Sequence, residues 1–208
     1  IDQIPYSIES TIAEIDTLFF KTYKWYEIYN FIEACIEYFP FDEKKEDFII
    51  LLNDCLEIEN SAYRVINYQI TPITSEQEIQ SIEQAIENTN PYSGVQQHLN
   101  QALKLMSDRQ NPDYRNSIKE SISALEGICK IIANKENAGF QETLAIIQNK
   151  YDLHKSLKEG FVKFYGYTSN GDGIRHAMLE ESNLSYIDAK FMLVACTNFI
   201  NYLIEKTK

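Results

Sequence analysis

Apolar residues recur at spacings of three and four along most of the chain, and this periodicity limits the possible fold more than any other feature. Residues at that spacing share one face of an α-helix. Near the start of the chain the pattern joins Ile8, Ile12 and Ile15. A later run at spacings of four and three consists of Ile118, Ile122, Leu125, Cys129 and Ile132. The sequence therefore predicts a mainly α protein, built as a helical bundle.

Residues 63–74 depart from this pattern. They are rich in aromatic and β-branched residues and contain Pro72 near their end, which favours an extended segment or a short hairpin. The last helical pattern, from Ile187 to Leu203, is apolar nearly all round. That breadth places the last helix either at the centre of a bundle or in a dimer interface. Helix starts are predicted at Ser75 with Glu78, Ser93 with Gln96, Asn111 with Pro112, and Ser185 with Asp188.

The net charge of −12 is concentrated in the front half of the chain. Residues 1–90 carry five Lys and Arg against eighteen Asp and Glu, whereas residues 91–208 carry fourteen against thirteen. The apolar pattern also breaks at Asn90-Pro91. We therefore predict an acidic, mostly helical domain over residues 1–90 and a helical bundle over residues 91–208. An acidic protein repels nucleic acid, but the second segment is exempt from this argument.

Several classes of protein receive no support from the sequence. No apolar run approaches the roughly 20 residues of a membrane span, and no signal-peptide pattern opens the chain. The first residue is Ile1 rather than Met, so further residues are expected before it. Cys35, Cys55, Cys129 and Cys196 lie far apart in apolar helical patterns. They are predicted to be reduced core thiols of a cytoplasmic protein, with no metal site and no cofactor.

The segment Tyr165–Ala177 carries the most distinctive chemistry. It places Gly166, Gly171 and Gly173 just before an adjacent Arg175 and His176. An imidazole transfers protons near neutral pH and a guanidinium binds phosphate, so the pair indicates phosphodiester chemistry. The alternative is that both side chains merely open the next helix and face solvent.

Three runs in the second half, 113–126, 165–177 and 191–203, together resemble the AbiJ-type abortive-infection proteins, whose C-terminal part is a HEPN domain. In the front half, the runs 25–33 and 57–64 and the Pro72-Ile-Thr segment are similar to the fourth type of AbiJ N-terminal domain. The resemblance covers nearly the whole chain. It implies a helical bundle that dimerises through its C-terminal helices and acts in phage defence or toxin-like growth arrest.

The resemblance also implies metal-independent cleavage of RNA, either tRNA or mRNA, to 2′,3′-cyclic phosphate ends. HEPN ribonucleases place a His four to six residues after an Arg at a helix start, and no Arg of this chain is followed in that way. Either the site is assembled differently or catalysis has been lost. The predicted catalytic residues are Arg175, His176 and Arg115, and the predicted substrate-binding or orienting residues are Asn116, Lys119 and Glu120. Glu120 is expected to hold an imidazole tautomer.

The alternative function is a non-catalytic HEPN-type module that binds a partner protein or a nucleotide signal. An antitoxin or a sensor is the expected kind of protein partner, and no membrane association is expected. A third possibility is that the acidic front half is a sensor or inhibitory surface for a separate effector.

Overall fold

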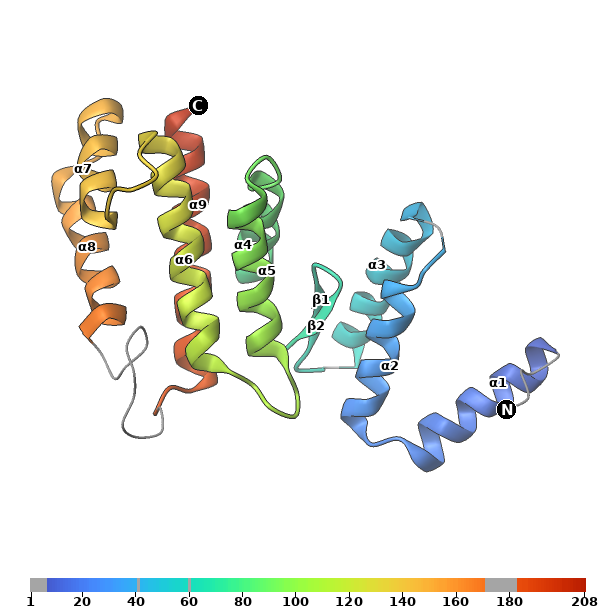
Figure 1. The fold of residues 1–208 in the computed structure, drawn as a ribbon. Helices are drawn as coiled ribbons and strands as arrows, with labels where there is room; N and C mark the ends of the chain where they lie inside the picture. Colours follow the sequence, from blue (N-terminus) through green and yellow to red (C-terminus); the bar gives the residue numbers. More distant parts are fainter. Residues whose placement is uncertain (1–6, 41, 60, 171–182) are drawn as a thin grey trace. The chain divides into compact units, whose positions relative to one another are not determined.

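The computed structural model describes residues 7–40, 42–59, 61–170 and 183–208. The predicted mainly α fold is confirmed, with one short antiparallel hairpin (Figure 1). The chain divides into two compact units, Ile1–Ser61 and Ala62–Lys208. We call them the first and the second unit. The helices, followed by the strands, are α1 Ile8–Thr17, a π-helical turn Leu18–Thr22, α2 Trp25–Glu37, α3 Asp42–Ile58, α4 Glu76–Asn88, α5 Ser93–Ser107, α6 Tyr114–Ala133, α7 Phe140–Tyr151, α8 Lys155–Asn170, α9 Tyr186–Thr207, β1 Arg64–Ile66 and β2 Gln69–Thr71.

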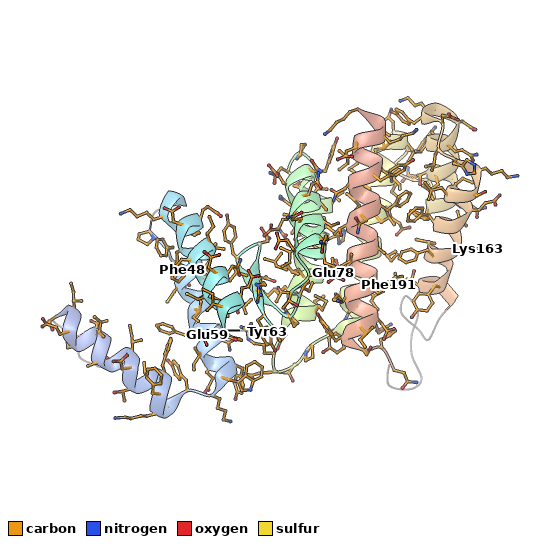
Figure 2. All side chains as sticks on the ribbon, turned by 180° about the vertical axis from the view of Figure 1, so that it is seen from behind. Phe48, Glu59, Tyr63, Glu78, Lys163 and Phe191 are labelled. Carbon is orange, nitrogen blue, oxygen red and sulfur yellow. The ribbon has the colours of Figure 1, made fainter. Side chains whose placement is uncertain are left out.

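The first unit consists of α1, the π-helical turn, α2 and α3. Aromatic side chains join its parts, since the ring centroids of Phe19 and Phe31 lie 5.3 Å apart and those of Phe39 and Phe48 lie 5.6 Å apart. Figure 2 labels Phe48 on α3. Ile36 and Leu56 are buried. The helix predicted from Ile8, Ile12 and Ile15 is present as α1.

The predicted extended segment forms the hairpin of β1 and β2, which opens the second unit. Arg64 pairs with Thr71, and Val65 with Ile70. The two turn residues, Asn67 and Tyr68, have φ angles of 45° and 67°. Positive φ at both turn positions is typical of a type I′ turn, whose twist matches that of the strands.

Helix α6 lies at the centre of the second unit, where it packs against α5 and α9 (Figure 1). Ile118, Ile122, Leu125 and Cys129, predicted to share a helix face, are all 0% exposed. Helix α4 packs on the other side of α9. There Asn201 donates to the Ser81 carbonyl at 2.9 Å.

Helix α9 is long and apolar enough to cross a membrane by length and composition alone, contrary to the expectation that no apolar run approaches the length of a membrane span. Half of it is buried within the protein, as in the core helix of a bundle. Its predicted start is confirmed, because the Ser185 amide and hydroxyl both donate to Asp188 Oδ2, at 2.8 and 2.6 Å.

The other predicted helix starts are confirmed only in part. Ser75 is the N-cap residue of α4 as predicted, but its hydroxyl bonds Gln77 and does not cap the helix. Helix α5 has Tyr92 at its N-cap, so Ser93 is already helical. Helix α6 is capped by Asp113, not by Asn111. The N-caps of α5 and α6 therefore lie one and two residues from the predicted positions, a difference that sequence patterns do not resolve.

The cysteine prediction is wrong for two residues. Cys129 and Cys196 are buried in the second unit, but Cys35 and Cys55 are exposed in the first. Helical periodicity placed all four on apolar faces. The first unit, however, has few elements to cover such faces, so a thiol on one of them can remain in contact with solvent.

The compact units meet at residue 61, whereas the predicted domains meet at residue 90. The boundary at residue 90 was predicted from the change in charge and in apolar spacing along the chain. The division into compact units does not test it, so it stays a prediction.

Candidate functional site at the junction of α5 and α6

Arg175 and His176 lie outside the described residues, as do Gly171 and Gly173. Helix α8 extends to Asn170 and includes Gly166. The first residues of the predicted glycine-rich loop are therefore helical. Packing does not require a glycine at position 166, because a Cβ on Gly166 would meet nothing within 4 Å.

The first turns of α6 carry the other predicted site residues. The carboxylate of Asp113 caps this helix by accepting from the amide of Asn116 at 3.0 Å, and the Asn116 side chain donates to Asp113 Oδ2 at 2.6 Å. Asn116 is thereby held at the helix start. Lys119 is exposed, whereas Arg115 and Glu120 are half-buried.

Helices α5 and α6 run antiparallel, and their close packing brings Glu120 opposite a residue from α5. Near one end of the junction the Ser117 hydroxyl donates to the Ala102 carbonyl at 2.8 Å. Near the other end Gly127 lies against Val95, where an added Cβ would come within 3.1 Å of Val95 Cγ2. The absence of a side chain at Gly127 lets the two backbones approach.

Between these two contacts, the imidazole of His98 meets Glu120. His98 Nδ1 lies 2.6 Å from Glu120 Oε2, and the two side chains are 43% and 20% exposed. A carboxylate accepts only, so this contact requires the imidazole proton to sit on Nδ1. The other ring nitrogen, Nε2, then has its lone pair available, and no described residue hydrogen-bonds to it.

A half-exposed imidazole with one nitrogen bonded to a carboxylate can transfer protons. The carboxylate fixes the tautomer and stabilises the imidazolium that forms when Nε2 takes up a proton. Glu120 was predicted to hold the tautomer of an imidazole, and the imidazole that it contacts in the structure is that of His98.

The side chain of Arg115 lies on a different side of α6 from that of Glu120. At 3.6 residues per turn, its side chain starts about 140° around the helix from that of Glu120, and it shares a face with Lys119. The structure therefore brings together His98 and Glu120, with Asn116 one turn away on the same face as Glu120. It places Arg115 on a neighbouring face.

A signal for His98 was present in the sequence. His98 and Glu120 are equally distant along the chain from Arg109, in the segment that joins α5 to α6. In an antiparallel helical hairpin, residues placed symmetrically about the connection lie opposite each other. Symmetry about the connecting segment restricts the partners of His98 to a stretch of α6 within about one turn of Glu120.

No group of three or more His, Cys, Asp and Glu residues within the described ranges could hold a metal ion. The side chains described at the α5–α6 junction include an imidazole, carboxylates and an amide.

Comparison with known proteins identifies the front of the chain. Residues 1–88 match the family described as AbiJ N-terminal domain 4, which confirms the resemblance predicted for that part. The match ends close to the predicted boundary at residue 90, and it includes the hairpin and α4 of the second unit. No curated protein and no solved structure matches the chain. None of the comparisons supports a HEPN domain in the C-terminal part.

Proposed function

We propose that this protein acts in abortive infection and that its second unit is a metal-independent endoribonuclease with His98 as a proton-transfer residue. The AbiJ-type domain at residues 1–88 suggests the role in phage defence. The nuclease proposal is carried by one observation, the 2.6 Å contact between His98 Nδ1 and Glu120 Oε2 on a half-exposed surface.

The chemistry follows from the position of the imidazole proton. His98 Nε2 takes the proton from a ribose 2′-hydroxyl, and the oxygen attacks the adjacent phosphorus. The bond from phosphorus to the 5′-oxygen breaks, leaving a 2′,3′-cyclic phosphate. The departing 5′-oxygen takes a proton from a second acid, for which His176 is the sequence-based candidate. Lys119 and Arg115 are the predicted residues of α6 whose positive charge would stabilise the phosphate.

The test uses purified full-length protein and total cellular RNA in EDTA. Loss of a general acid-base typically costs about a hundred- to ten-thousand-fold in rate, so His98→Ala is expected to abolish detectable cleavage. Glu120→Gln should lower the rate less, because it leaves the imidazole in place. His154→Ala is the matched control: His154 is exposed and accepts only from the Ser156 amide, at 3.2 Å.

The pattern of loss distinguishes the candidate sites. Cleavage that survives in His98→Ala but is lost in His176→Ala would move the catalytic role to the predicted Arg175-His176 pair. Loss in both variants would assign the two proton transfers to two histidines. Absence of cleavage by the wild type would favour the non-catalytic module, which the net charge of −12 also favours.

The dimer through the C-terminal helices is part of the same proposal. On α9, Ile187 is 72% exposed and Phe191 is 62% exposed. The ring of Phe191 lies 6.1 Å from that of Phe164 on α8 (Figure 2). These side chains form an apolar strip that a second copy can cover. Sedimentation of wild type beside Phe191→Ser tests this, and an unchanged mass would contradict it.

A further inference from the structure

The first unit has many large hydrophobic side chains on its surface and few in its interior. Only Ile36 and Leu56 are buried hydrophobic residues among its described positions. Its large exposed hydrophobic residues are Ile8, Ile12, Phe20, Trp25, Tyr38, Ile50, Leu51 and Ile58. Contiguous apolar surface of this kind marks sites of protein interaction.

On α3 the exposed side chains form one continuous face. Ile50, Leu51, Asp54, Cys55 and Ile58 are all exposed, and their spacing along the sequence places them on one side of a helix. We call these five residues the α3 outer face. Ile50 and Leu51 are each 61% exposed, and Ile58 is 75% exposed.

The opposite side of α3 packs within the unit. Leu56 is buried there, and Phe48, beside the outer face, stacks on Phe39 in the segment between α2 and α3. Ile50 and Leu51 remain mostly exposed within the unit. Apolar surface that stays exposed in its own unit can be covered by a partner.

The charges around this face specify the partner. Residues 47–59 contain Asp47, Asp54, Glu57 and Glu59 and no Lys, Arg or His. The whole first unit carries four Lys and Arg against fourteen Asp and Glu, a net charge of −10. A second copy that paired through the same face would place acid against acid. A partner whose apolar stripe is flanked by Lys and Arg would be attracted.

We propose that the α3 outer face binds an amphipathic helix of a partner protein whose apolar stripe is flanked by basic residues. Helices recognise each other in this way by laying an apolar stripe against a hydrophobic face, while flanking charges select the partner and its orientation. The proposal concerns the first unit and is independent of ribonuclease activity in the second.

The chain has a built-in reporter for this interaction. Cys55 lies within the α3 outer face, and Cys35 on α2 is the other exposed thiol, whereas Cys129 and Cys196 are buried. Alkylation by iodoacetamide, followed by mass spectrometry, therefore measures protection of the face at Cys55. Cys35 in the same unit serves as the control.

The experiment uses the full chain and a synthetic helix of Leu–Lys heptads as the probe. Two further peptides serve as controls, one of Leu–Glu heptads and one of Lys and Ser with equal charge and no apolar stripe. The Leu–Lys helix is expected to bind and to slow alkylation of Cys55 without slowing that of Cys35. The control peptides are expected to protect neither thiol.

Two paired variants separate the apolar and charged contributions. Ile50→Ser with Leu51→Ser is expected to weaken binding at least about tenfold, because two hydrophobic side chains leave the interface. Asp47→Asn with Asp54→Asn should weaken it and reduce its dependence on salt. Ile131→Ser, at an exposed position of α6 in the second unit, is the matched control and should leave binding unchanged. All of these positions are exposed, and far-UV circular dichroism verifies the fold.

Three results would overturn the proposal. The first is equal binding of the Leu–Lys helix by the wild type and by the Ile50→Ser, Leu51→Ser variant, since attraction would then be due to charge alone. The second is no binding to the wild type. The third is a Cys55 that is already protected without peptide, which would mean that a second copy or the rest of the chain covers the face.

Discussion

The substitution Ile82→Ala on α4 tests whether the two compact units unfold independently. Ile82 is 1% exposed and lies on the face of α4 that is buried in the second unit. Replacing a fully buried Ile by Ala costs about 2–5 kcal/mol, since the lost side chain leaves a cavity. For a unit of this size each kcal/mol lowers the melting temperature by about 2–4 °C. A fall of about 10 °C is therefore expected for the second unit.

The chain provides a separate signal for each unit. Its single tryptophan, Trp25, lies in the first unit, so tryptophan fluorescence follows that unit. Most of the helical residues lie in the second unit, so far-UV circular dichroism follows mainly the second. Ile82→Ala should move the circular dichroism transition and leave the fluorescence transition in place. The reverse is expected for Ile36→Ala, because Ile36 is 0% exposed in the first unit.

Equal shifts of both signals in Ile82→Ala would refute this reasoning. They would mean that residues 1–88 unfold together, as one domain that includes α4. In that case the boundary near residue 90, where the family match ends, would describe folding better than the compact units do.

Two further predictions concern packing and pH. Gly127→Val is expected to destabilise the second unit by about 1–3 kcal/mol, because even a Cβ would come within 3.1 Å of Val95 Cγ2. Gly94→Ala is the comparison, since its Cβ would meet nothing within 4 Å. It should be neutral or slightly stabilising in thermal melts. Burial raises the pKa of Tyr186, which donates to the Pro72 carbonyl, to about 12. The neutral phenol therefore stabilises the fold fully below about pH 10, and this contribution is lost as the pH rises toward 12. The stability difference between wild type and Tyr186→Phe should shrink over that range in urea titrations, and a constant difference would contradict the assignment.

The positions of the helices could be predicted because they depend on local pattern. The spacing of Ile118, Ile122, Leu125 and Cys129 identified the buried face of α6, and all four are buried. The β-branched and aromatic residues before Pro72 identified the hairpin. The helix starts were less predictable, since several neighbouring side chains can cap and only one geometry is formed.

The candidate site could be predicted only in part. Glu120 was expected to bind an imidazole, and it does so, but the imidazole is that of His98 on another helix. Which side chains meet depends on the distance and rotation of α5 against α6. Those are set by packing between residues far apart in the sequence, such as Val95 and Gly127.

The sequence by itself determined the helical class, the hairpin, the acidic character of the front half and its relation to the AbiJ N-terminal domains. These properties follow from local periodicity, from summed charge and from the order of residues, which need no knowledge of neighbours in space. The tertiary structure alone decided that Cys129 is buried while Cys55 is exposed, and that His98 meets Glu120. Burial and pairing depend on which faces other helices cover, and two helices with the same apolar pattern can differ entirely in that respect.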